Sequence, residues 1–211
     1  MFALLKNFFT VLILSSPIYL WSDENPYNFI DSNAQKMVIV LKENKSLFLE
    51  DRQLYEQKIK EIFEPMIDFR RVAATVMGKK YYLASSKEQR AEFVVIFKDS
   101  LLDTYAETLA QWENQTITTI FPKNMEIQIY DLKNIEVQQT LNTGSSKYPI
   151  SYKLRKNNDN SWSIVNIIVN GVNLGLTFRN QFQALAIKNN GNIESTLDGW
   201  VSDAGDAGIS G

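Results

Sequence analysis

The sequence has no cysteine and no histidine among its 211 residues. It therefore lacks disulfides, thiol nucleophiles, the usual zinc ligands and the commonest general base. The formal net charge of -2 gives no basic excess, so nucleic acid is not an expected partner. No phosphate-binding glycine loop, dinucleotide fingerprint or G-x-S-x-G elbow occurs. We therefore expect no catalytic residues, no metal and no cofactor, and so not an enzyme.

The first 22 residues have the pattern of a secretory signal peptide. Lys6 precedes an apolar run from Phe8 to Leu14, which is too short to span a bilayer as a helix of about 20 residues. An uncleaved anchor is the alternative. The rest of the chain shows no linker or repeat, so we expect one domain over residues 23–203 and a flexible, small and polar tail over 204–211.

A long amphipathic helix is predicted from Ser85 to Trp112. Its apolar residues fall four apart, and the serines at its start are followed three residues later by Glu88 or Gln89, a capping box. The apolar face needs a large partner, and the strand-forming region downstream is the expected one. The residues of this stripe are Phe93, Phe97, Leu101, Tyr105 and Leu109.

Further helices are predicted on both sides of this one. Upstream, one helix is predicted over residues 26–48. A second begins at Asp51, with Leu54 turned inward. A third covers 68–78, where Gly78 is suited to end a helix. Downstream, one helix begins at Thr177 and a short one follows the glycine at position 191.

Between the helices the apolar period changes from about four to two, which predicts strands. The last strand is apolar on both faces except for Asn166, which indicates a central place in the sheet. The pattern predicts an α+β fold with a curved antiparallel sheet and a helical N-terminal part packed on it. The predicted strands include Ile117–Phe121, Met125–Ile129, Ile135–Val137, Tyr148–Leu154 and Trp162–Val169.

Acidic residues give little support for catalysis. Asp99 and Asp103 lie four apart on the long helix but off its apolar stripe, which is typical of a solvated face. Asp131 and Glu136 lie near strand ends with no visible partner. Tyr105 lies on the apolar stripe itself, either as a core tyrosine or as part of a ligand cavity. Composition and spacing do not separate a filled core from an apolar cavity.

Several stretches resemble the MlaC family of periplasmic phospholipid-binding proteins. They are IDFRRVAATVMGKKYYLASSKEQRAEFVVIFKDSLLDTYAETL, then ENQTI, and YPISYKLRKNNDNSWSIVNIIVNGVNLGLTFRNQF, and the resemblance runs from Asn25 to about Trp200. The chain departs from the family at Asn166, where aspartate is common, at Asn173, where serine is common, and at Tyr82, where tryptophan is usual.

The resemblance implies an NTF2-like fold and a carrier whose apolar pocket, between sheet and helices, holds the acyl tails of a phospholipid. It also implies partners: an outer-membrane lipoprotein complex and an inner-membrane ABC transporter with an MCE-domain subunit. Such a carrier maintains the lipid asymmetry of the outer membrane. The alternatives are a carrier of another lipid such as a hopanoid, a small exported enzyme with Asp131 or Glu136 in the cavity, and a scaffold whose cavity is closed by side chains.

The candidate lipid-binding residues are those expected on inward faces of the long helix, of one strand and of the last strand with the turn that follows. They are Phe97, Leu101, Tyr105, Leu109, Tyr148, Ile150, Tyr152, Ile164, Ile167, Val169 and Val172.

Overall fold

The computed structural model describes residues 25–123 and 131–203. The predicted signal peptide (1–22), the expected strand from Met125 to Ile129 and the tail (204–211) lie outside this part of the chain. The helices are α1 (Pro26–Glu43), α2 (Leu47–Glu50), α3 (Arg52–Met66), α4 (Phe69–Ala84), α5 (Lys87–Ala110), α6 (Leu174–Lys188) and α7 (Ile193–Asp198). The strands are β1 (Thr116–Ile120), β2 (Asn134–Asn142), β3 (Lys147–Lys156), β4 (Trp162–Val169) and β5 (Val172–Asn173).

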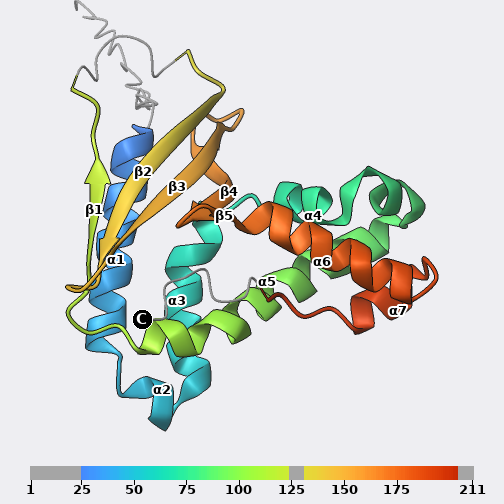
Figure 1. Ribbon diagram of the computed structural model, residues 1–211, viewed down its shortest axis with the longest axis horizontal. Coiled ribbons are helices and arrows are strands. Elements are labelled where there is room, and N and C mark those ends of the chain that lie inside the picture. Colours follow the sequence, from blue (N-terminus) through green and yellow to red (C-terminus); the bar gives the residue numbers. More distant parts are fainter. Residues whose placement is uncertain (1–24, 124–130, 204–211) are drawn as a thin grey trace, which may run out of the picture.

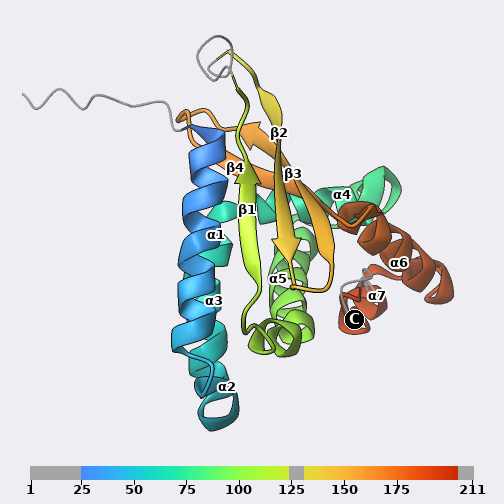
Figure 2. The ribbon, with the colours of Figure 1, turned by 60° about the vertical axis from the view of Figure 1, so that its left-hand side comes forward.

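The five strands form one sheet in the order β1-β2-β3-β4-β5, with every neighbouring pair antiparallel. α1 contacts β1 and β2, and α3 contacts both α1 and β4, so these two helices cover one face of the sheet (Figure 2). The predicted α+β class with a helical N-terminal part on an antiparallel sheet is confirmed. Figure 1 shows a second group of helices, α4, α6 and α7, beyond the end of the sheet.

The long central helix α5 follows its prediction closely. The Ser86 hydroxyl accepts a hydrogen bond from the Gln89 N–H at 3.2 Å, and the Ser86 N–H donates to Gln89 Oε1 at 3.0 Å. This reciprocal capping box satisfies backbone donors that the first helical turn leaves open. α5 therefore starts where its capping residues indicate.

The other N-terminal helices differ from their predictions. The segment predicted as one helix over 26–48 is divided, because α1 ends at Glu43 and the single turn α2 follows. In α3, Leu54 is 38% exposed rather than inward, and Tyr55 and Ile59 take the buried positions. The helix predicted to end at Gly78 continues to Ala84, since Gly78 interrupts it with φ 70° and Tyr81 then packs on the ring of Phe182.

β4 is not the central strand that its two apolar faces indicated. It pairs with β3 along its length but with β5 only through Ile168 and Val169, so β3 is central and β4 lies near the edge. Its apolar composition has another cause, because α3, α4 and α6 all contact it. Helices, rather than flanking strands, exclude water from this strand.

The apolar face of α5 has two partners rather than the sheet alone. Its N-terminal half packs against α4, and α7 also contacts α5; Phe93 and Phe97 are fully buried there. Its C-terminal half contacts α3, with Leu102 and Ala106 buried. The expectation that the strands downstream cover the whole stripe is therefore wrong. The sheet faces only the C-terminal half, across a cavity.

Candidate functional site

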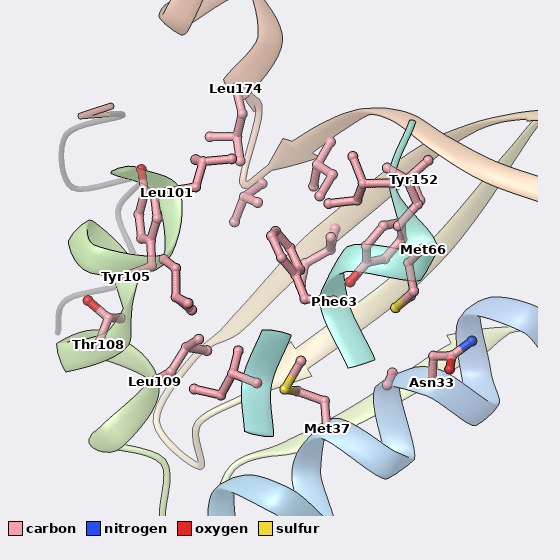
Figure 3. Close-up of a pocket in the computed structure, with 18 of the residues that line it drawn as sticks. Asn33, Met37, Phe63, Met66, Leu101, Tyr105, Thr108, Leu109, Tyr152 and Leu174 are labelled. Carbon is pink, nitrogen blue, oxygen red and sulfur yellow. The ribbon is translucent and has the colours of Figure 1, made fainter. Parts of the chain in front are cut away.

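A cavity of about 530 Å³ lies between the sheet and the helices α1, α3 and α5. Figure 3 shows Leu101 and Leu109 of α5 on one side of it, and Phe63, Met66 and Tyr152 on the other. Aliphatic and aromatic side chains form nearly all of the wall, and among the residues that the structure describes none that lines the cavity is Asp, Glu, Lys or Arg. The volume falls in the range of roughly 300–1,000 Å³ that is typical of sites for small ligands.

Most of the residues predicted from sequence meet in this wall. Phe97, Leu101, Tyr105, Leu109, Ile150, Tyr152, Ile164, Ile167 and Val169 all line the cavity. Tyr148 and Val172 do not: Tyr148 packs beside Leu141, and Val172 pairs with Val169 in the sheet. That these residues bind lipid stays a prediction, whereas their grouping around one cavity is a feature of the structure.

Sequence reasoning expected the helical N-terminal part to pack on the sheet, but it named no lining residue of the two helices, α1 and α3, that close the cavity on its remaining side. α1 and α3 lie far from α5 in the chain, and their apolar spacing showed that each has a buried face but not what that face contacts. Lining residues that were not predicted include Asn33, Ala34, Met37, Val38 and Leu41 of α1 and Ile59, Phe63 and Met66 of α3.

Several polar lining residues lie near the C-terminal end of α5, whereas Asn33 of α1 and Asn166 of β4 lie elsewhere in the wall. Thr108 and Gln111, at the C-terminal end of α5, are exposed, and Gln115 and Thr143 nearby are half-buried. Figure 3 shows the Thr108 hydroxyl turned away from the cavity. An apolar interior with a polar rim suits a ligand whose apolar part enters and whose polar part stays outside.

Tyr152 carries the one titratable group on the β3 side of the cavity wall. Burial raises the pKa of its hydroxyl. Part of the ring surface is accessible, because it faces the cavity rather than bulk water. Among residues 25–123 and 131–203 the hydroxyl has no hydrogen-bond partner. The group is therefore neutral at ordinary pH, and the wall stays uncharged.

The two acids proposed for an enzyme do not lie in the cavity. Neither Asp131 nor Glu136 is among its lining residues. Glu136 accepts hydrogen bonds from Lys153, Ser151 and Gln138, which lower its pKa to about 2. A carboxylate held ionised in this way, away from the cavity, is poorly suited to exchange protons with a ligand there. The enzyme alternative in the form that uses these acids is contradicted.

The fold and cavity together define an α+β protein with an internal, largely apolar cavity. The sequence matches the family described as "MlaC protein" over residues 31–202, and the chain belongs to that family. In the part of the chain that the structure describes, no helix is long and apolar enough to cross a membrane.

Named relatives agree with this assignment. The toluene tolerance protein ttg2D of Pseudomonas putida is 27% identical over 208 residues, covering 98% of this chain and 94% of its own. The intermembrane phospholipid transport system binding protein MlaC of Haemophilus influenzae is 23% identical, covering 97% of this chain and 89% of its own. A phospholipid-binding protein from Ralstonia solanacearum, solved with a phospholipid, has the same fold: TM-score 0.73, 23% identity, with 83% of this chain and 94% of that one covered.

Proposed function

We propose that this protein is a periplasmic phospholipid carrier that holds acyl tails in the cavity between the sheet and α1, α3 and α5. The single observation that carries the proposal is the uncharged, largely apolar wall around about 530 Å³. Membership of the MlaC family and the names of the relatives support the same ligand.

The size of the cavity argues that it is meant to be filled. The apolar side chains of its wall lack protein neighbours on the side that faces the cavity, and an apolar ligand would supply those contacts. Each methylene of an acyl chain that leaves water for such a wall contributes about 0.8 kcal/mol.

The carrier would work between two membranes. We infer that the N-terminal 22 residues direct export and that the protein passes lipid between an outer-membrane lipoprotein complex and an inner-membrane ABC transporter with an MCE-domain subunit. The affinity would come mainly from the tails, because the cavity wall offers few polar groups. Such a carrier would help to maintain lipid asymmetry of the outer membrane.

Purification of the full chain from a periplasmic extract under mild conditions tests the ligand. Native mass spectrometry and solvent extraction should reveal bound phospholipid. The delipidated protein should take phospholipid from liposomes. An empty protein that also fails to take up lipid would end the carrier proposal, and recovery of a hopanoid alone would replace its ligand.

A further inference from the structure

Two methionine thioethers form part of the cavity wall. Met37 of α1 and Met66 of α3 line the cavity, whereas Met77 of α4 does not. Met77 is 1% exposed and lies in the core cluster that also contains Phe93 and Phe182. These are the three methionines of residues 25–123 and 131–203. The described part of the chain therefore has two thioethers beside the cavity and one in a packed core, which serves as an internal comparison.

Figure 3 shows how the two cavity methionines lie. The thioether of Met37 projects from α1 into the cavity, toward Leu109 of α5, and that of Met66 projects from α3 toward α1. Met37 is half-buried, and Met66 is 8% exposed. In a packed core, methionine fills irregular gaps between its neighbours. Here both side chains border open space instead.

A small solute can reach this space from outside. Thr108 and Gln111 are exposed to solvent and line the same cavity, so the cavity continues to the surface beside the C-terminal end of α5. Hydrogen peroxide is little larger than water and fits easily into a volume of about 530 Å³. An acyl chain in the same space would cover the two thioethers and exclude such a reagent.

Oxidation would change the chemistry of the wall. The chain has no cysteine, so no thiolate competes for the oxidant. A peroxide transfers one oxygen atom to the thioether sulfur: the O–O bond breaks, an S=O bond forms, sulfur gives two electrons to the peroxide, and water leaves. The resulting methionine sulfoxide is polar. A bound acyl tail would remove water from its oxygen, which costs free energy unless a donor replaces that water.

We propose that Met37 and Met66 form an oxidation site that bound lipid protects. Oxidants of the peroxide class convert the two thioethers to sulfoxides when the cavity is empty, and the oxidised protein no longer takes up lipid. This proposal rests on the carrier function proposed above and adds a form of regulation to it. Protein that holds lipid is shielded, and reduction of the sulfoxides by methionine sulfoxide reductases restores the empty protein.

Peptide mass spectrometry after treatment with hydrogen peroxide tests the reactivity of each methionine. The delipidated full-length protein is compared with the same protein loaded with phosphatidylglycerol. In the empty protein, sulfoxide should form at least about tenfold faster at Met37 than at Met77, with Met66 between them, because susceptibility follows exposure. Loading with lipid should slow oxidation of both cavity methionines to near the rate of Met77. Equal rates at all three residues, or equal rates with and without lipid, would contradict the proposal.

Uptake of phosphatidylglycerol from liposomes tests the consequence of oxidation. The affinity of the oxidised protein should fall at least about tenfold, since the tails would bury a polar group in an apolar wall. The double variant Met37→Leu, Met66→Leu conserves volume and should take up lipid both before and after treatment with peroxide. Met77→Leu is the matched control and should lose uptake on oxidation, as the unaltered protein does. Methionine sulfoxide reductase should restore uptake to the oxidised protein.

Three results of the uptake experiment would overturn the proposal. They are normal uptake by the oxidised protein, an equal loss in the double variant, and a loss that accompanies unfolding detected by circular dichroism. A failure of the carrier function itself looks different, because the untreated protein would then take up no phospholipid. The order of reactivity among Met37, Met66 and Met77 would still decide whether the oxidant enters through the cavity.

Discussion

The apolar stripe of α5 packs against other helices in its N-terminal half, here called the filled half, and borders the cavity in its C-terminal half, the hollow half. In the N-terminal half, Phe93 is fully buried, and its ring centroid lies 4.9 Å from that of Phe182 and 5.5 Å from that of Trp200. In the C-terminal half, Leu101 and Leu109 are only partly buried by protein and face the cavity. The spacing of apolar residues is alike in both halves. The contrast shows that the periodicity predicts which face of the helix is shielded from water. It does not indicate whether that face packs against protein or borders a cavity.

Hydrogen bonds and an ion pair connect the elements that surround the cavity beside the hollow half of α5. The carboxylate of Asp31 on α1 accepts a hydrogen bond from Thr119 on β1 at 2.7 Å, and Thr119 accepts one from Gln139 on β2 at 2.8 Å. On the other side, Lys60 of α3 pairs with Asp99 of α5 at 2.7 Å. These contacts fix the distance between walls without placing side chains in the interior. The Asp99 that sequence reasoning assigned to a solvated face thus joins two helices at the surface.

The last described segment of the chain is hydrogen-bonded to α5 and packs on the aromatic cluster of the filled half. The Ser202 N–H donates to the Ser100 hydroxyl at 2.6 Å, and the Thr104 hydroxyl donates to the Ser202 carbonyl at 2.7 Å. Trp200, two residues earlier, is 5% exposed and packs on the rings of Phe93 and Phe182. The segment therefore closes the aromatic cluster at the point where the stripe of α5 changes from filled to hollow.

The largest effect is expected from Phe93→Ala in the filled half. Removing a fully buried phenylalanine that contacts three other aromatic rings should destabilise the protein by about 3–5 kcal/mol. The matched change in the hollow half, Leu101→Ala, should lower stability by less than about 2 kcal/mol, because its side chain already borders a cavity. Urea unfolding of the delipidated variants measures both. Equal losses would mean that the two halves are packed alike.

A smaller effect on stability, but a clear one on ligand binding, is expected from Leu109→Trp. The larger side chain enters the cavity and takes space that the proposed acyl tails would occupy, whereas a filled core would be strained by about 1–3 kcal/mol. We expect at least a tenfold loss of lipid uptake, equal to about 1.4 kcal/mol, with the fold intact. Val95→Trp is the control, since Val95 lies on the same helix and is 55% exposed. A variant that unfolds, or binds lipid normally, would contradict the assignment of Leu109 to the tail site.

Sequence reasoning recovered what depends on local signals. The capping box of α5 and the alternation in β2 and β3 each correspond to an element of the structure. The break within α4 was mistaken for its end, because a glycine at positive φ interrupts a helix whether or not the chain resumes it. Tyr81, whose burial holds the second part of α4, depends on Phe182 about a hundred residues away.

The candidate site was predicted only in part, because local sequence patterns do not show which elements meet in the fold. Residues of α5 and β3 were found because their apolar residues fall on one face at helical or strand spacing. β4 is apolar on both faces, so its sequence did not show which face points inward. The α1 and α3 sides of the cavity were missed, because a stripe such as Met37 and Leu41 is equally compatible with contact to a neighbouring helix. Sequence patterns identify buried faces, and the placement of distant elements decides which of those faces border a cavity.

The smallest effect is expected from Tyr152→Phe, which tests whether the hollow half excludes water and charge. Burial raises the pKa of Tyr152 in the folded protein, whereas the unfolded chain ionises near 10. Above pH 10 the unfolded state therefore binds fewer protons than the folded state, and stability falls as pH rises. Removing this hydroxyl should recover at most about 0.8 kcal/mol at pH 10.5, the limit in which the folded hydroxyl stays protonated, and nothing at pH 7, by the linkage relation. Urea unfolding at both pH values measures the difference, and Tyr27→Phe, at a tyrosine outside the cavity lining, is the control. An identical pH dependence in the unaltered and Tyr152→Phe proteins would mean that water reaches the hydroxyl, and that the wall of the cavity is more polar than its residues indicate.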